Sequence, residues 1–287
     1  MRFVFALLLI LAALTLQTVA LSDTTPDNPA AYSVLIEEKL TEKKSNYGSG
    51  FFLNKGGFLF LVTARHVLFD EKALIRPFPL LSDNATLVSY SNDPKENKRN
   101  VTKLNLKALN EAGYVQSSDH DVAVVKIATL TEQGSTLRTE GLPGVIFDNG
   151  SNLTAIPDNL LKKFDDVIIG GDAIIFGYPV TIGLKGYPQI DYFRPLMRKG
   201  LIAGVNATNR NNRTIILDCP VNHGNSGGTV VEVEHTFTGN KYKLIGLVSQ
   251  YIPYLNEDNF DLPSNPKYDN SGYSVIVPID YALDLLK

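Results

Sequence analysis

The chain has 287 residues, of which 44% are hydrophobic and 20% are charged, and its formal net charge is −3. This is enough material for one large globular domain or two small ones. A slightly acidic chain without clusters of Lys and Arg lacks the basic surface that binding to a phosphate backbone needs, so we expect no nucleic-acid partner.

The first residues have the pattern of an export signal. Arg2 gives a positive start, Phe3–Leu16 is almost wholly apolar, and Thr18–Ala20 places small residues before a polar stretch. The alternative is an uncleaved anchor, but the apolar run is shorter than the roughly 18–20 residues of a spanning helix. We predict a cleaved signal peptide over Met1–Ala20 and an exported mature protein, periplasmic or secreted, without stable membrane insertion.

After a polar lead-in over Leu21–Ala31, the fold is expected to start near Tyr32. The apolar residues that follow form short runs rich in Val and Ile, separated by turn residues such as Asn54–Gly57, which is typical of strands and hairpins. Such a pattern predicts an all-β fold of the barrel or sandwich kind. The predicted strands are Tyr32–Glu37, Gly50–Leu53, Phe58–Ala64, Ala85–Tyr90, Asp121–Ile127, Asp172–Tyr178, Lys199–Val205, Thr214–Leu217, Thr229–Val233, Leu244–Gln250 and Tyr273–Val277.

Two polar stretches interrupt the strands, Ser91–Ser118 and Thr129–Asp166, and we interpret both as surface excursions. The second contains Pro157–Lys163, a predicted short helix with an Asp near its start. In the tail, Asp280 is a candidate N-cap followed by apolar residues at helical spacing, which predicts a terminal helix over Asp280–Lys287.

One turn has the composition of a nucleophile site. Acyl transfer by a hydroxyl group needs a serine on a turn, a histidine that takes its proton and a carboxylate that orients the histidine. Gly224–Gly228 reads Gly-Asn-Ser-Gly-Gly and directly precedes the predicted strand Thr229–Val233. Its glycines let the backbone bend so that the N–H groups of Gly224 and Ser226 face an incoming carbonyl oxygen, as an oxyanion hole requires.

A histidine and a carboxylate stand at strand ends. His66 follows the strand Phe58–Ala64, which holds its ring in a fixed position and suits a general base. Asp121 opens the strand Asp121–Ile127, where a carboxylate can be half-buried and paired. Each motif alone is more often structural than catalytic. Together, in the order His, Asp, Ser, they predict a triad of His66, Asp121 and Ser226.

Two alternatives concern the fold and the carboxylate. Gly224–Gly228 also fits the nucleophile elbow of α/β-hydrolases, but that fold needs its His after the Ser, and only His235 follows. Asp119 would face the same way as Asp121 in an extended strand, so it is the reserve for the orienting carboxylate.

A metal site is the third alternative. It would use His66, His120 and His223, which lack any close pair of ligands in the sequence. We therefore predict no metal, and the acyl-transfer chemistry needs no cofactor.

The motifs together resemble the trypsin-like serine peptidases, and in particular the bacterial exported branch that includes the high-temperature-requirement proteases. The resemblance spans nearly all of Tyr32 to Pro278. It rests on Gly48–Phe51, Thr63–Val67, Asp121–Val125, Gly171–Pro179, Gly224–Gly228, Ile245–Ser249 and Gly272–Pro278.

The resemblance implies two six-stranded antiparallel β-barrels with a short C-terminal helix and a catalytic cleft between the barrels. The expected domains are an N-terminal barrel over 32–165, with His66 and Asp121, and a C-terminal barrel over 166–287, with Ser226. Asn225 stands where many relatives have an acidic residue, so activity should need no cut that frees a new N-terminus to form a salt bridge. No PDZ module is expected.

The resemblance also implies the substrate pocket. Its floor lies about six residues before the serine, at Pro220, without a carboxylate that would pair with a substrate Lys or Arg. Val248, Ser249 and Gln250 would wall the pocket, with Ser249 accepting substrate main-chain hydrogen bonds. His223 would lie at the rim and contact substrate, or stand as a solvated loop histidine.

The function expected from these motifs is an exported serine endopeptidase that cleaves proteins or peptides through an acyl-enzyme. The alternative is a catalytically silent member of the same fold that binds peptides or proteins in the cleft between the barrels, since a fold does not fix a function.

Overall fold

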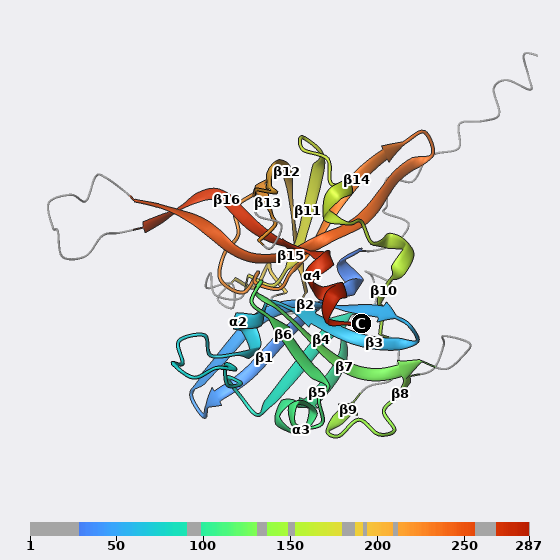
Figure 1. Ribbon diagram of the computed structural model, residues 1–287, viewed down its shortest axis with the longest axis vertical. Coiled ribbons are helices and arrows are strands. Elements are labelled where there is room, and N and C mark those ends of the chain that lie inside the picture. The colour runs from blue at the N-terminus through green and yellow to red at the C-terminus, as the bar shows by residue number, and fades with distance from the viewer. Residues whose placement is uncertain are drawn as a thin grey trace, which may run out of the picture.

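The computed structural model describes residues 29–90, 99–130, 137–148, 153–179, 187–191, 194–208, 212–255 and 268–286. The molecule has two β-rich halves, with the C-terminal helix where they meet (Figure 1). No helix in these ranges is long and apolar enough to cross a membrane. The predicted signal peptide, Met1–Ala20, lies outside the described residues.

The first half is a ten-stranded sheet whose main path does not return to its first strand within the described residues. Two short strands leave that path, because β10 pairs with β2 and β8 with β7. Its strands, in spatial order, are β6 (Val115–Ser118), β7 (Val122–Leu130), β3 (Phe58–Thr63), β2 (Lys44–Lys55), β1 (Ser33–Thr41), β4 (Asn84–Tyr90), β5 (Arg99–Asn105) and β9 (Val145–Phe147), with β8 (Leu137–Arg138) and β10 (Ile156–Pro157) off the path.

The second half is a closed barrel of six strands. In spatial order they are β11 (Asp172–Gly177), β12 (Leu196–Asn206), β13 (Thr214–Asp218), β16 (Tyr268–Pro278), β15 (Gly239–Leu255) and β14 (Thr229–Thr236). The mostly-β prediction is therefore confirmed. Two six-stranded barrels are not confirmed, because the first sheet has ten strands and an open path.

The C-terminal helix α4 (Ile279–Leu285) joins the two halves. Its Ile279 and Ala282 are fully buried and belong to the same apolar cluster as the interior of the first sheet. Leu244 and Leu247 of the barrel strand β15 reach the same cluster. The C-terminal helix therefore packs against the first half, and the two halves share one apolar core at their contact.

The first predicted surface excursion is a correction. Ser91–Ser118 contains β5, the helix α3 (Leu106–Glu111) and β6, and it contributes Leu104, Leu106 and Leu109 to the core at 0–2% exposure. The reason is that β5 buries one face only, so its polar residues alternate with inward ones and the segment reads as polar.

The second excursion and the helix ends differ in detail. Thr129–Asp166 contains β8, β9 and β10 and buries Phe164. Within Pro157–Lys163, only a 3₁₀ turn over Asp158–Leu160 forms.

The terminal helix is confirmed, but Asp280 is not its N-cap. Its carboxylate accepts the backbone N–H of Phe164 at 2.9 Å, and Pro278 occupies the N-cap position without a side-chain cap. The side chain therefore serves a contact between distant segments, which local capping rules do not consider.

A buried cluster of charged residues holds the segment between β10 and β11 against the barrel strand β14. Lys162 Nζ lies 2.9 Å from Glu232 Oε1 and 2.9 Å from Glu234 Oε1, and Glu232 is 2% exposed. Burial alone would lower the pKa of Lys162, but the two carboxylates outweigh it and raise the pKa, so the lysine is charged. Removing one partner of a buried pair leaves an uncompensated charge.

We therefore expect Lys162→Met to destabilise the protein by about 3 kcal/mol, because it leaves the Glu232 carboxylate buried without its cation. Urea unfolding measures the loss. Lys243→Met is the matched control, since Lys243 Nζ makes an exposed hydrogen bond, to the carbonyl of Asn159, and no ion pair with the described residues. Equal stabilities of the two variants would show that the buried cluster does not hold this segment.

Candidate active site

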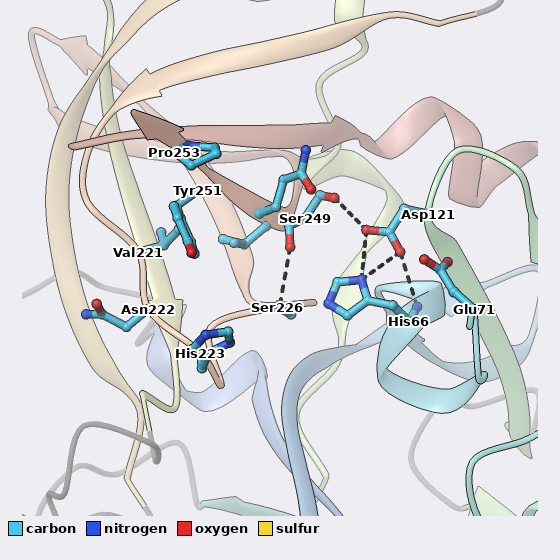
Figure 2. Close-up of a pocket in the computed structure, with 12 residues that line it drawn as sticks. His66, Glu71, Asp121, Val221, Asn222, His223, Ser226, Ser249, Tyr251 and Pro253 are labelled. Carbon is cyan, nitrogen blue, oxygen red and sulfur yellow. Dashed lines mark hydrogen bonds and ion pairs between the residues drawn. The ribbon is translucent and has the colours of Figure 1, made fainter. Parts of the chain in front are cut away.

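A pocket of about 580 Å³ gathers most of the residues that the sequence singled out (Figure 2). It receives residues from the short helix α2 (Arg65–Leu68), from the turn before β7, from the turn before β14 and from β15. The residues that line it are His66, Glu71, Asp121, Val221, Asn222, His223, Ser226, Val248, Ser249, Gln250, Tyr251 and Pro253.

Strand pairing places His66 beside Asp121. Thr63 at the end of β3 lies opposite Ala123 in the neighbouring strand β7, so the residues that follow β3 and those that precede β7 meet at one edge. His66 Nδ1 lies 2.9 Å from Asp121 Oδ1 and 3.0 Å from Oδ2. The backbone N–H of His66 also donates to Oδ1, at 3.2 Å. The carboxylate therefore fixes both the ring and the backbone of the histidine.

Asp121 stands just outside β7, which begins at Val122, so the prediction that it opens the strand is wrong by one residue. Its φ of 57° makes it the only residue other than glycine with a positive φ in the described part of the chain. Asp tolerates this left-handed region better than most residues, though at some energetic cost. The turn aims the carboxylate at α2, and Ser249 Oγ donates to Oδ2 at 2.5 Å from the other half.

The His66–Asp121 pair shifts both pKa values in the direction of an ion pair. Burial alone lowers the pKa of His66, but the hydrogen bond and the charge of Asp121, with a smaller effect of Glu71, outweigh it and raise the pKa above 6.5. Burial alone raises the pKa of Asp121, but the contacts with His66 and the hydrogen bond from Ser249 outweigh it and lower the pKa below 3.8. Asp121 is therefore charged, and it favours a proton on His66.

The turn that carries Ser226 is held from both halves. Gly224 and Gly227 adopt φ values of 94° and 81°, which the bend requires and glycine allows. Ser49 of β2 donates its hydroxyl to the carbonyl of Gly224 at 2.6 Å, and its N–H to the carbonyl of Ser226 at 2.8 Å. No role in the site was predicted for Ser49 from the sequence. Its position between Gly48 and Gly50 was the only available signal.

Asn225 stiffens the same turn from within. It is 2% exposed, its Oδ1 accepts the N–H of Asn222 at 3.1 Å, and its own N–H donates to the carbonyl of Asn222 at 3.0 Å. Within the described residues, no acceptor is bonded to the N–H of Gly224 or of Ser226. These two N–H groups are the predicted oxyanion donors; Ser226 lines the pocket, whereas Gly224 is buried and is not among the lining residues.

The Ser226 side chain lies in the pocket, but its hydroxyl is bonded to a carbonyl group and not to the histidine. It donates to the carbonyl of Ser249 at 3.2 Å, and no hydrogen bond joins it to His66 in the described structure (Figure 2). Rotation about χ1 moves a serine hydroxyl between staggered positions, and catalytic hydrogen bonds are often loose before substrate binds.

The predicted pocket residues fall into two groups. Val248, Ser249, Gln250 and His223 line the pocket, whereas Pro220, the expected floor, is exposed and lies outside the lining. Five residues that line the pocket were not predicted from the sequence, namely Glu71, Val221, Asn222, Tyr251 and Pro253. Their only signal was proximity in the chain to the residues that were named.

The residues of the two alternative sites, the reserve carboxylate and the metal site, have other partners. Asp119 is 89% exposed and pairs with Arg65 at 3.1 Å and with Arg76 at 3.5 Å, so it does not orient His66. His120 stacks on Tyr281 of α4 with the ring centroids 3.7 Å apart. Of the three histidines of the metal alternative, His66 and His223 line the pocket and His120 does not, and no group of three metal-ligating side chains occurs among the described residues.

Comparisons with known proteins match this architecture. Residues 48–239 match the model of a family described as trypsin-like peptidase domain. Among solved structures, Deg5 aligns with 90% of this chain and 88% of its own, at 18% identity and a TM-score of 0.50. This likeness concerns the fold. No curated protein sequence matches the chain.

Two further structures align with 90% of this chain. A serine endoprotease from Yersinia pestis does so at 17% identity and a TM-score of 0.49. An HtrA-type protease, AlgW, in a structure with a decapeptide, does so at 16% identity and a TM-score of 0.47. This chain covers 62% and 63% of their lengths, less than two thirds of either.

The tight packing of the serine turn generates a prediction about Gly227. A Cβ added there would lie 2.1 Å from the carbonyl oxygen of Ser49. Gly113→Ala is the matched control, because Gly113 has a φ of 78° and no atom within 4 Å of its added Cβ. We expect Gly227→Ala to lose about 1–3 kcal/mol more stability than the control in urea unfolding. Equal losses would mean that only the backbone angle matters.

Proposed function

This chain belongs to the trypsin-like peptidase family, and we propose that within it the protein is a serine endopeptidase with Ser226 as nucleophile, His66 as general base and Asp121 as the orienting carboxylate. The observation that carries the proposal is the His66–Asp121 pair, 2.9 Å apart, in the same pocket as Ser226. A histidine fixed by a carboxylate beside a serine is the arrangement that activates a hydroxyl.

In the proposed reaction, the Ser226 hydroxyl turns from the Ser249 carbonyl toward His66 Nε2. Oγ then attacks the peptide carbonyl carbon while His66 takes the hydroxyl proton. The negative charge that forms on the carbonyl oxygen is stabilised by the N–H groups of Gly224 and Ser226. His66 returns the proton to the leaving amine, the C–N bond breaks, and an ester remains on Ser226. Water hydrolyses this ester with the same histidine as base.

Asp121 would act by holding His66 with Nδ1 protonated, so that Nε2 faces the serine. Three hydrogen bonds to the ring and backbone of His66 support this role. The hydrogen bonds of Asn225 to Asn222 support a turn that is formed without activation by a new N-terminus.

The pocket favours uncharged side chains at the cleavage site. Val221, Val248 and Tyr251 give it apolar walls. The two carboxylates in the lining are both engaged, Asp121 with His66 and Glu71 with Arg65 at 2.7 Å. A substrate Lys or Arg would therefore find no unpaired carboxylate there, and we propose a preference for aliphatic or other uncharged residues.

We further propose that the protein is exported after cleavage of Met1–Ala20, on the strength of the charge and hydropathy of that segment. The proposed domains, 32–165 and 166–287, divide the chain between β10 and β11.

One observation favours the second candidate function, a silent relative that binds peptides. The Ser226 hydroxyl is bonded to the Ser249 carbonyl instead of to His66. If that bond persists when a peptide binds, the cleft would hold the peptide without cleaving it.

We expect Ser226→Ala to lower peptide hydrolysis by about 10³-fold or more while leaving the fold intact, because it removes the nucleophile. Hydrolysis of an unfolded protein such as reduced casein and far-UV circular dichroism measure the two quantities. Ser117→Ala, at an exposed position of β6, is the control and should keep full activity. Activity retained in Ser226→Ala would exclude the mechanism.

The pH profile should report the His66–Asp121 pair. The base acts only when neutral, so kcat/KM should fall as the pH falls through the pKa of His66, with a midpoint above 6.5. Asp121→Asn removes the charge that raises this pKa. Its acid limb should move to lower pH while the rate falls by about 10⁴-fold. If the acid limb of the Asp121→Asn profile has the same midpoint as that of the parent protein, Asp121 does not act on His66.

A further inference from the structure

We infer that the β15–β16 ribbon binds the part of a polypeptide substrate that lies N-terminal to the cleaved bond, and that its residues Leu255 and Tyr268 select an aliphatic or aromatic side chain there. This inference rests on the proposed function of the pocket and adds a substrate class to it.

The ribbon is an extension of the strand that lines the pocket. β15 has 17 residues, and its pairing with the barrel strand β14 ends at Leu247. Its pairing with β16 continues to Leu255, which lies opposite Tyr268. The two strands therefore leave the barrel together, and Figure 1 shows them projecting from it as a long arm.

One face of the ribbon is turned toward the pocket. Side chains alternate along a strand, so Pro253 and Leu255 share a face, and their partners Asn270 and Tyr268 share it too. Pro253 lines the pocket. The Asn270 side chain donates to the carbonyl of Val221, another pocket residue, at 2.7 Å. Leu255 and Tyr268 therefore continue the pocket wall outward.

These two side chains are exposed although they are large and apolar. Leu255 is 41% exposed and Tyr268 is 60% exposed, and they lie directly opposite each other. A scattered exposed apolar residue needs no explanation, whereas a cross-strand pair continuous with a pocket marks a contact surface. The opposite face presents Tyr254 and Asp269, which alternate away from the pocket.

The direction of proton transfer determines which part of the substrate lies along the ribbon. In the proposed reaction, His66 protonates the leaving amine, so the part of the substrate C-terminal to the cleaved bond lies on the His66 side of Ser226. The acyl part, which is N-terminal to the cleaved bond, lies on the opposite side. Figure 2 shows His66 and Tyr251 on opposite sides of Ser226. The acyl part therefore leads along β15 toward Leu255.

The reach of the chain sets the length of substrate that is needed. From Ser249, whose carbonyl lies beside Ser226, to Leu255 is about six residues of strand, or roughly 20 Å of extended chain. A substrate must therefore present an extended segment with an apolar residue about five or six positions before the cleaved bond. An unfolded polypeptide meets this requirement, and a tight surface loop does not.

The test uses the full-length mature Ser226→Ala protein and fluorescein-labelled peptides, with binding measured by anisotropy. The long peptide is Ser-Leu-Phe-Ser-Ala-Ala-Val-Ala, the second replaces Leu-Phe by Ser-Ser, and the third is Ala-Ala-Val-Ala. We expect the first to bind about tenfold more tightly than the other two. Adding Leu255→Ser and Tyr268→Ser should remove this difference. Adding Tyr254→Ser instead, on the far face at 49% exposure, should preserve it.

Equal binding of the three peptides, no binding of any, or an equal effect of the Tyr254 control would overturn the inference. The parent protein separates this result from the proposed function. If it cleaves the short peptide without any preference for the long one, the inference fails and the peptidase stands. If the ribbon binds the long peptide in Ser226→Ala but the parent leaves it intact, the inference stands and the peptidase fails.

Discussion

The pairing of β3 with β7 is the constraint on which the site depends. With Thr63 opposite Ala123, the residues after one strand meet the residues before the other, and the His66–Asp121 hydrogen bonds follow from that register. A shift by one residue would turn every side chain of β7 to its other face and carry the carboxylate away from the ring. Most residues of β7 are buried, so such a shift would also disturb the packing of the apolar core.

Hydrogen bonds between the two halves lie at the candidate active site. Ser249 of the barrel donates to Asp121 of the first half, and Ser49 of the first half donates to the serine turn of the barrel. Ser49 Oγ also accepts the N–H of Tyr178, so one hydroxyl joins three segments. The site therefore needs both halves to be folded and docked, and α4 and its neighbours join them through one apolar cluster with the first sheet.

Much of this could be predicted from the sequence, because strands with alternating or continuous apolar residues carry a strong local signal. The residues named for chemistry, His66, Asp121 and Ser226, do line one pocket, although their roles stay predictions. The failures have physical causes. Strands such as β5, which bury only one face, have so many polar residues that their sequence resembles a loop. Contacts such as Ser49 with Gly224 join residues far apart in the chain, which no local pattern reports.

The central claim is that Ser226 is an activated nucleophile with a formed oxyanion site. The most direct measurement is labelling of the mature protein with a fluorophosphonate, followed by mass spectrometry to locate the adduct, since such reagents need both features. We expect an adduct on Ser226 that is absent from His66→Ala. A folded protein that gains no adduct on Ser226 would contradict it and leave a cleft that binds peptides without cleaving them.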